Sequence, residues 1–309
     1  MRAITYHQYG PPSVLHLTEI DEAPLSPGHV RVAMQAAGVA PVDAKLRAGL
    51  LQHQVPISLP KVPGRDGAGI VTAIGEGVDG LRIGDAVCVM PAMLARGTTL
   101  AVAVLPQQQI VHKPAGLDMQ EAAALLQPGA SAWIPLMRTA PIKAGMKILI
   151  HAGSGAVGSL MVQLARHLGA EVTVTCRHAN VDYVAGLGAD RVIAYDREDF
   201  STLRDQDVVF DPVGGATHER SYAVLRPGGH LVWLVAAPIR DRGAEFGVTV
   251  TRAMITEDRD ILQHIVDLAS AGVWRPSVSR VLPMAEIARA HELLEQGAVT
   301  RGRLVLDIA

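Results

Sequence analysis

The sequence predicts an α/β protein that combines a small β-rich domain with a doubly wound parallel sheet. Apolar runs typical of buried parallel strands alternate with helical patterns through the middle of the chain. A glycine-rich turn, residues 153–158, directly follows the first of these runs. Residues 1–118 instead show short alternating runs broken by many prolines, which is typical of strands with turn-dense connections. These observations together predict two domains of different architecture.

A βαβ unit is predicted for residues 147–176. The apolar run 148–150 indicates a buried strand, apolar residues then recur at spacings of three and four up to Leu168, and residues 171–176 are β-prone. The turn after the first strand spells G-x-G-x-x-G, and a strand before it with a helix after it is the context of a dinucleotide site. The cofactor-binding residues expected in this turn are Gly153, Ser154, Gly155, Ala156, Val157 and Gly158.

Each glycine of this motif has an expected role. Gly153 permits the tight turn, Gly155 lets the backbone approach a pyrophosphate, and Gly158 lets the helix pack closely on its strand. The free N–H groups at the start of the helix would then face the anion. A tight turn without a ligand is the alternative, which the flanking strand and helix disfavour.

The turn after the second strand of this unit favours NADP(H) over NAD(H). An NAD site usually places an acid about 20 residues after the first glycines, where it binds the ribose hydroxyls. Residues 176–180 contain no acid, and Arg177 can donate two hydrogen bonds to a phosphate. We therefore expect Arg177 and Asn180 to contact the cofactor. A merely exposed Arg177 remains the alternative, since arginine is commonly exposed.

Composition sets limits on function. A chain of 309 residues is longer than one typical core, and 49% hydrophobic with 19% charged residues is the profile of a soluble protein with a large core. The net charge of −2 with interspersed signs predicts no nucleic-acid or membrane partner. No leader or membrane-spanning run is seen, so we expect a cytoplasmic protein. Cys88 and Cys176 lie far apart in apolar runs, which disfavours a disulfide.

The remaining elements continue the α/β alternation. Further strands are predicted at 191–195, 207–210 and 231–235, followed by helical patterns at 261–269 and 285–295 and a closing strand at 303–308. That last strand is expected to return to the first domain. Asp118 is a predicted N-cap, and Glu121 completes a capping box at the start of a helix over 118–126.

Several phrases together resemble the medium-chain dehydrogenase/reductase superfamily, and within it the zinc-free branch of quinone oxidoreductases and enone reductases. They span nearly the whole chain, at 40–45, 62–69, 152–158, 188–190, 211–215 and 301–306. The resemblance implies a GroES-like domain built from both ends of the chain, residues 1–118 and 275–309. It also implies a Rossmann NADP(H)-binding domain over residues 119–274.

No metal site is expected. The zinc-dependent members of that superfamily carry Gly-His-Glu where this chain has Gly64, Arg65 and Asp66, and they carry a four-cysteine lobe that this chain lacks. An arginine cannot be a ligand, and a catalytic zinc needs three protein ligands. The histidines offer no close pair at metal-binding spacing.

The resemblance also suggests catalytic residues. Asp43 belongs to the family phrase at 40–43, in which Ala40 replaces the usual asparagine, and Lys45 stands where enone reductases have a lysine near the substrate carbonyl. We take Lys45 and Asp43 as the catalytic candidates, with a solvated loop lysine as the alternative for Lys45. His53 is a weaker candidate. Ser131 resembles a family threonine at the nicotinamide, and Tyr195 resembles a tyrosine at the adenosine phosphate end.

The predicted function is NADPH-dependent reduction of a quinone or an α,β-unsaturated carbonyl without zinc. Two alternatives stay open, a carbonyl reductase or alcohol dehydrogenase of the same fold, and a non-enzymatic NADPH-binding protein. The first would need another strong electrophile, and the second predicts a basic face that the composition lacks. A homodimer is expected, because the β-rich residues 231–251 could extend the sheet across a two-fold axis. The sequence does not name the substrate.

Overall fold

A computed structural model describes residues 1–235 and 238–308. The chain divides into two compact units, and we describe each by itself. The first unit comprises Met1–Gln127, Glu257–Val299 and Arg303–Ala309, and the second comprises Pro128–Thr256 and Thr300–Gly302. The short segment 300–302 therefore belongs to the second unit, although its neighbours on both sides belong to the first.

The first unit is built mainly from antiparallel strands. A two-stranded sheet joins β1 (Arg2–Thr5) to β2 (His16–Glu19). The larger, seven-stranded sheet has the order β14-β15-β3-β4-β5-β7, with β6 also paired to β3. Its strands are β3 (His29–Val39), β4 (Gly67–Ile74), β5 (Ala86–Val89), β6 (Val102–Pro106), β7 (Ile110–His112), β14 (Val278–Pro283) and β15 (Arg303–Asp307).

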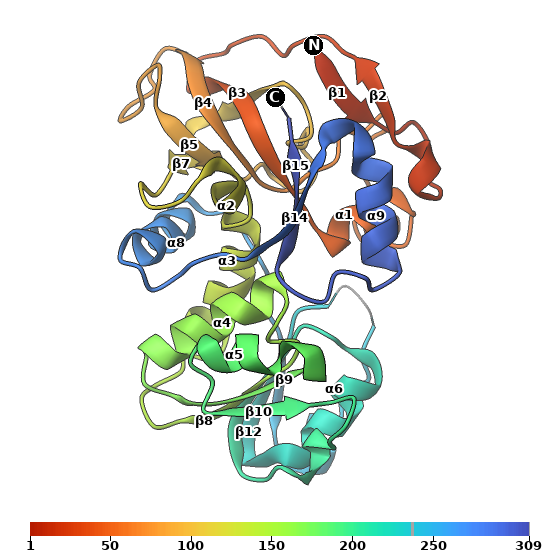
Figure 1. Ribbon diagram of the computed structural model, residues 1–309, viewed down its shortest axis with the longest axis vertical. Helices are drawn as coiled ribbons and strands as arrows, with labels where there is room; N and C mark the ends of the chain where they lie inside the picture. Colours follow the sequence, from red (N-terminus) through yellow and green to blue (C-terminus); the bar gives the residue numbers. More distant parts are fainter. Residues whose placement is uncertain (236–237, 309) are drawn as a thin grey trace. The chain divides into compact units, whose positions relative to one another are not determined.

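The closing strand returns to the first unit, as predicted. β15 pairs antiparallel with β3, with Leu304 opposite Val39, and parallel with β14 (Figure 1). Leu304 and Leu306 are buried in the core that this sheet covers. We did not predict β14, because its side chains are exposed or half-buried and its sequence lacks the apolar alternation that marks a strand.

Four helices accompany the strands of the first unit: α1 (Pro41–Arg47), α2 (Met119–Ala123), α8 (Arg259–Ser270) and α9 (Ile287–Glu295). The capping box at the start of α2 is confirmed, since the Glu121 N–H donates to Asp118 Oδ1 at 2.7 Å. Helix α8 was expected in the Rossmann domain. The structure groups it with the first unit, where Arg259 donates to the Gln107 carbonyl, so the unit boundary differs from the expected one at residue 274.

The second unit is a doubly wound parallel sheet, as predicted. Its strand order is β10-β9-β8-β11-β12-β13, and every neighbouring pair is parallel. The strands are β8 (Lys147–Ile150), β9 (Glu171–Cys176), β10 (Arg191–Ala194), β11 (Gln206–Asp211), β12 (Leu225–Trp233) and β13 (Thr249–Arg252). The strand order reverses between β8 and β11, which is where such sheets bind ligands.

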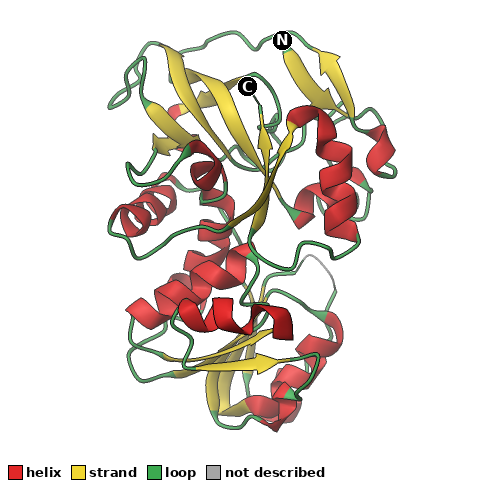
Figure 2. Cartoon of the chain, viewed as in Figure 1, coloured by secondary structure: helices red, strands yellow, loops and turns green. Residues whose placement is uncertain are grey.

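Helices connect these strands (Figure 2). They are α4 (Ala156–His167), α5 (Val181–Gly186), α6 (Gly215–Ser221) and the short α7 (Gly243–Phe246), while α3 (Leu126–Ile134) carries the chain from one unit into the other. Crossover connections between parallel strands carry helices that cover the faces of such a sheet. Strand β8 is buried, and Ile148, Leu149 and Ile150 have no exposed surface. Part of the β-rich run predicted at 231–251, residues 236–237, lies outside the described residues. None of the described helices is long and apolar enough to cross a membrane.

Candidate functional site

The glycine turn of the second unit has little room for side chains. Ala152 adopts a left-handed conformation, with φ of 53°, and brings its carbonyl oxygen beneath the first turn of α4. A Cβ on Gly158 would lie 2.3 Å from that oxygen, so only glycine fits there. A Cβ on Gly153 would lie 2.0 Å from Val174 Cγ1 of β9. We expected Gly153 to allow the tight turn; the left-handed residue is Ala152, and Gly153 is required by packing.

Gly155 differs from the other two glycines, because a Cβ there would meet nothing closer than 3.4 Å. It is the N-cap of α4, and no side chain caps this helix. Gly155 forms a parallel β-bridge with Gly302, which engages the Ala156 N–H. The first N–H groups of an α-helix have no partner within the helix, and those that remain here belong to Val157 and Gly158. Open space beside uncapped N–H groups fits a phosphate group of a dinucleotide.

Two of the expected cofactor residues have side chains that serve the protein itself. Ser154 Oγ donates to the Thr300 carbonyl at 2.8 Å, and Asn180 Nδ2 donates to the same oxygen at 2.9 Å and to Ser154 Oγ at 3.3 Å. The Gly302 N–H in turn donates to the Ser154 carbonyl at 2.9 Å. Both side chains are buried. They hold the segment 300–302 against the glycine turn, and their contact with a cofactor stays a prediction.

The cationic position after β9 has an aromatic neighbour, Tyr195, directly after β10. Arg177 is exposed and donates from Nε to the Tyr195 hydroxyl at 3.0 Å, which brings together two expected cofactor residues. Its two Nη groups have no hydrogen-bond partner within residues 1–235 and 238–308. Asp196 follows Tyr195 and accepts the His178 N–H at 2.8 Å, which lowers the pKa of that carboxyl. An acid, Asp196, therefore lies beside this turn. It comes from the segment after β10, so the sequence of the turn itself does not reveal it.

Ser131 lies within α3 and is buried. The expected role of Ser131 beside a nicotinamide stays a prediction.

Asp43 acts as a local anchor in the first unit. Its Oδ2 accepts the Ala40 N–H at 2.9 Å, which caps α1, and its Oδ1 accepts the Gly64 N–H at 3.3 Å. The side chain is buried, and burial raises the pKa of this carboxyl against the effects of these hydrogen bonds and of the nearby arginines. Asp43 thereby fixes the start of α1 to the loop at Gly64, and its expected part in catalysis stays a prediction.

Lys45 lies in the last turn of α1, two residues after Asp43. Its side chain is half-buried, and its ammonium has no ion-pair or hydrogen-bond partner within the described part of the chain. An ammonium held on a short anchored helix, without a protein partner, is available to a ligand. His53, the weaker candidate, is exposed on the loop that follows.

At the position of the zinc motif, the side chains of Arg65 and Asp66 are engaged with other parts of the first unit. Asp66 is fully buried and forms an ion pair with Arg303 Nη2, and its Oδ2 accepts the Gln127 N–H at 3.1 Å. Arg65 is also buried, and its Nη1 donates to the Pro91 carbonyl at 3.0 Å. No group of three or more potential metal ligands occurs among residues 1–235 and 238–308. These side chains do not fit a catalytic zinc.

The Asp66–Arg303 ion pair depends on a glycine. A Cβ on Gly38 would lie 2.5 Å from Arg303 Nε and 2.6 Å from Asp66 Oδ1. Burial raises the pKa of Asp66 to about 6, although Arg303 and the Gln127 N–H act in the opposite direction. The pair thus holds a carboxylate that would otherwise be protonated near neutral pH.

Sequence reasoning missed a pocket in the first unit. It is a small hollow of about 10 Å³, room for about one water molecule, and its polar lining residues are Tyr6, Asp43, Lys61 and Arg65. The only signal in the sequence was a lysine within the otherwise apolar run 59–63. Lys61 itself is 8% exposed.

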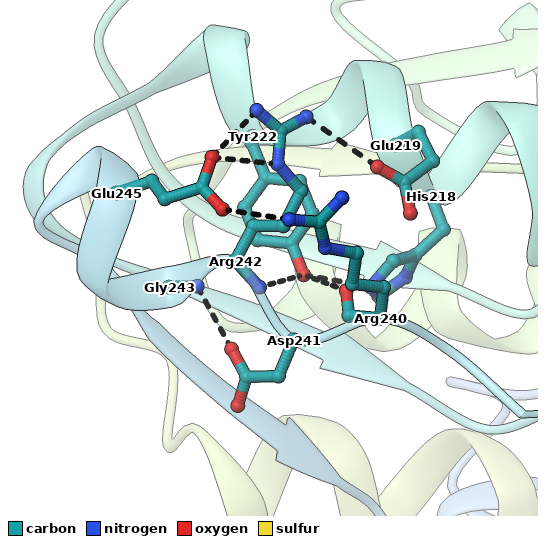
Figure 3. A network of polar contacts seen from close by, with 8 residues as sticks. All are labelled: His218, Glu219, Tyr222, Arg240, Asp241, Arg242, Gly243 and Glu245. Carbon is teal, nitrogen blue, oxygen red and sulfur yellow. Dashed lines mark hydrogen bonds and ion pairs between the residues drawn. The ribbon is translucent and has the colours of Figure 1, made fainter.

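A second polar network holds the loop that precedes α7 in the second unit. His218 Nδ1 donates to Asp211 Oδ2 at 2.9 Å, and His218 Nε2 contacts the Tyr222 hydroxyl at 3.1 Å. That hydroxyl donates to the Arg240 carbonyl and accepts the Arg242 N–H, as Figure 3 shows. Hydrogen bonds of Asp211, His218 and Tyr222 thus fix this loop to the end of β11.

Comparison with known proteins agrees with this geometry. Residues 26–115 match the alcohol dehydrogenase GroES-like domain, and residues 187–306 match a zinc-binding dehydrogenase domain. A 2-haloacrylate reductase from a Burkholderia species is 31% identical over 98% of this chain and 98% of its own length. A chloroplastic NADPH-dependent alkenal/one oxidoreductase from Arabidopsis thaliana is 31% identical over 99% of this chain and 79% of its own.

A solved structure extends the comparison to the fold. The crystal structure of Escherichia coli quinone oxidoreductase complexed with NADPH superimposes with a TM-score of 0.90 and 30% identity, covering 99% of this chain and 100% of that one. The predicted resemblance is confirmed at the level of sequence and of fold. The chain therefore belongs to the medium-chain dehydrogenase/reductase superfamily, among the quinone oxidoreductases and enone reductases.

Proposed function

We propose that this protein is an NADPH-dependent reductase of quinones or α,β-unsaturated carbonyl compounds that works without zinc. The observation that carries the proposal is the open side of Gly155 at the uncapped start of α4. Relatives named as quinone oxidoreductase, alkenal/one oxidoreductase and haloacrylate reductase support the reaction class.

The second unit supplies the cofactor contacts in this proposal. The N–H groups of Val157 and Gly158 bind the pyrophosphate, and the Nη groups of Arg177 bind the phosphate that distinguishes NADPH from NADH. When bound, NADPH supplies the hydride that adds to the far end of the conjugated double bond. The residues Ser154 and Asn180 keep the glycine turn in place through Thr300.

The first unit supplies the group that stabilises the developing negative charge. The Lys45 ammonium donates to the substrate oxygen as it becomes an enolate or hydroquinone oxygen, and a preorganised donor there contributes most where charge develops. Asp43 keeps α1, and with it Lys45, in position through its bonds to the Ala40 and Gly64 N–H groups. The proton that completes the reduction comes from Lys45 or from solvent.

Zinc has no step in this scheme, because the positions that would ligate it hold Arg65 and the Asp66–Arg303 pair. Exhaustive treatment with a chelator is expected to leave the rate unchanged, and elemental analysis is expected to find no stoichiometric zinc. Activity that returns only when zinc is added back would contradict the proposal.

The experiment that tests the function is NADPH oxidation with a small panel of quinones, enals, enones and saturated ketones. We expect turnover of the conjugated substrates and none of the saturated ketones. Turnover of saturated ketones alone would favour a carbonyl reductase, and binding of NADPH without turnover of any substrate would favour a non-enzymatic protein.

We also propose a cytoplasmic homodimer. Strand β13 forms one edge of the six-stranded sheet, and its side chains are exposed or half-buried, which leaves an edge available for pairing with a second copy. The two cysteines are buried free thiols, as in proteins of reducing compartments. Gel filtration with light scattering is expected to give twice the mass of the chain, and a monomer at micromolar concentration would contradict the dimer.

A further inference from the structure

A buried lysine holds the turn formed by residues 91–95 of the first unit, the 91–95 turn. The Lys61 ammonium donates to the Ala95 carbonyl and, at 3.4 Å, to the Met93 carbonyl. Lys61 is itself fixed, because its main chain exchanges two hydrogen bonds with that of Tyr6, at 3.0 and 2.9 Å. Its side chain is buried, so water does not compete for these contacts. The main fold therefore sets the position of the turn.

The same turn is held at both of its ends. Arg65, which is also buried, donates from Nη1 to the Pro91 carbonyl at 3.0 Å. Beyond the other end, the Gly97 N–H donates to the Val62 carbonyl at 3.1 Å. A Cβ on Gly97 would lie 2.2 Å from the Pro63 carbonyl oxygen, so the two segments are in close contact there. One short stretch of the first unit thus anchors the whole turn.

The two anchoring cations do not serve stability. In the described part of the chain no carboxylate forms an ion pair with Lys61, and burial lowers the pKa of its ammonium to about 8. Arg65 Nη2 lies 3.9 Å from Glu257 Oε2, which is a weak pairing for a buried guanidinium. A buried cation without a close counter-ion is costly. Their contribution is the position that they give to the turn.

The anchored turn presents an apolar side chain beside the helix that carries Lys45. Leu94, in the turn, is 59% exposed. Its neighbour Met93 lines the same small hollow as Leu46 of α1, and Leu46 directly follows Lys45. The Leu50 N–H donates to the Lys45 carbonyl at 3.0 Å, and Leu50 is 72% exposed. The segment with the unpartnered ammonium therefore has exposed leucines near it, and burial of such side chains against a ligand is favourable.

We propose that Leu94 contacts the hydrocarbon part of the substrate, and that Lys61 is a positioning residue that holds the 91–95 turn for this contact. A substrate whose oxygen meets the Lys45 ammonium then lays its alkyl chain on Leu94. A charged substituent would lose hydration there without gaining a partner. The inference rests on the proposed reductase function and adds what the site selects, which is the length of an unbranched alkyl chain.

The test is the dependence of kcat/KM on chain length, measured as NADPH oxidation with butenone, 1-hexen-3-one and 1-octen-3-one. For the wild-type protein we expect kcat/KM to rise about two- to fourfold with each methylene group that becomes buried. Leu94→Ala should lower kcat/KM for octenone by about 10-fold, mainly through KM, and leave butenone unchanged. Because Leu94 is exposed, this variant is expected to fold as the wild type does.

Lys61→Met should produce the same selective loss, although Lys61 does not touch the substrate. Lys61→Arg keeps charged donors for the two carbonyls and should restore the preference for octenone. The double variant Lys61→Met/Leu94→Ala should lose no more than Leu94→Ala alone, because both changes remove one contact. A purely structural lysine would instead lower kcat for every chain length, and its effect would add to that of Leu94→Ala.

Lys113→Met is the matched control. Lys113, in the same unit, also donates to two carbonyls, those of Pro114 and Leu117, but these lie in a different turn. It should leave the chain-length dependence unchanged. If Lys61→Met does not fold, Leu94→Ala still decides whether the turn contacts the substrate.

Two outcomes would overturn the inference. The first is a wild-type chain-length dependence in Leu94→Ala. The second is a changed elution volume of Leu94→Ala in gel filtration with unchanged kinetics, which would assign Leu94 to a contact between subunits. Failure of the reductase function is distinct, because it would appear as no oxidation of NADPH with any of the ketones or with quinones.

Discussion

The two units of this protein bury polar groups of different kinds. Among the described residues, the buried lysine and arginines all lie in the first unit: Arg47, Lys61, Arg65 and Arg303. Among its described residues the second unit buries no lysine or arginine, and its buried groups include His151, His218 and a single aspartate, Asp211; the first unit also buries one histidine, His291. Arg177 of the second unit is exposed.

The difference follows from what each unit must connect. The ion pairs Asp66–Arg303 and Arg47–Glu295 join segments from opposite ends of the chain. Arg303 and Arg47 therefore connect distant segments of the first unit. Hydrogen bonds of His218 and Tyr222 join segments that lie close in sequence. Buried charges are expensive to leave unpaired, whereas buried neutral histidines make stability depend on pH.

The largest effect is expected from breaking the Asp66–Arg303 pair. Arg303→Met leaves Asp66 buried without its cation, and we expect it to lower the free energy of unfolding by about 3–5 kcal/mol. Urea denaturation at pH 8, above the pKa of Asp66, measures the loss. Adding Asp66→Asn to this variant removes the unpaired charge and should recover most of the stability. A single variant as stable as wild type would show that the pair contributes nothing.

The next effect concerns Lys45, whose ammonium has no partner among the described residues. Lys45→Ala should lower turnover roughly 100- to 1000-fold, as expected when one oxyanion donor is lost. Unlike Arg303→Met, it should leave the unfolding transition unchanged. Lys45→Arg should restore part of the rate, since it keeps the charge on a longer planar group.

Single-turnover oxidation of NADPH measures the Lys45 effect. The loss should be greater for an enone than for a quinone, which accepts hydride with less help. An unchanged enone rate in Lys45→Ala would make Lys45 only a surface lysine.

The third effect tests the neutral core of the second unit. His151 bonds to the Thr175 and Ser221 hydroxyls, and burial lowers its pKa to about 4 from an ordinary 6.5. The unfolded chain therefore binds the proton more tightly between these values. The stability that neutral His151 contributes is complete above pH 6.5 and is lost as pH falls toward 4, by up to about 3 kcal/mol.

His151→Asn should flatten this dependence in urea denaturation series between pH 7 and 4. The exposed His167 provides the control, since His167→Asn should keep the wild-type slope. The same slope in both variants would assign the acid sensitivity to other groups.

The smallest effect is expected at the exposed arginine. Arg177→Ala removes a charged hydrogen-bond donor and should weaken NADPH binding by about 1.5–3 kcal/mol while NADH binding changes little. Fluorescence titration with both cofactors measures it. Asp196→Asn, the control beside it, should not weaken NADPH, because that carboxylate faces the His178 N–H. Equal losses for both cofactors would remove Arg177 from the phosphate site.

Sequence predicted the glycine turn well because its constraints are local. Gly158 is required by the carbonyl of Ala152, six residues earlier, and the strand and helix on either side are marked by their own periodicity. The same holds for the capping box of α2, where Asp118 and Glu121 satisfy each other. Such features need no knowledge of the rest of the fold.

Features that depend on distant contacts escaped prediction. Asp66 and Arg303 are 237 positions apart, and nothing in either phrase reveals that they pair. The pocket likewise collects Tyr6, Lys61 and Met93 from separate segments. Ser154 and Asn180 were assigned to the cofactor because they lie near the glycine turn in sequence. Their side chains also bind the Thr300 carbonyl, and Thr300 follows Asn180 by 120 residues, so the sequence alone does not reveal this contact.

The position of β15 has a consequence for biosynthesis. It inserts between β14 and β3, and it carries the cation of Asp66, yet it is synthesised after all the other described strands. The sheet of the second unit can assemble during translation, because its strands run from residue 147 to 252. Until β15 has been synthesised, β3 lacks one of its neighbouring strands and Asp66 lacks its ion-pair partner Arg303. A nascent chain stalled before that point would present an open strand edge to other chains.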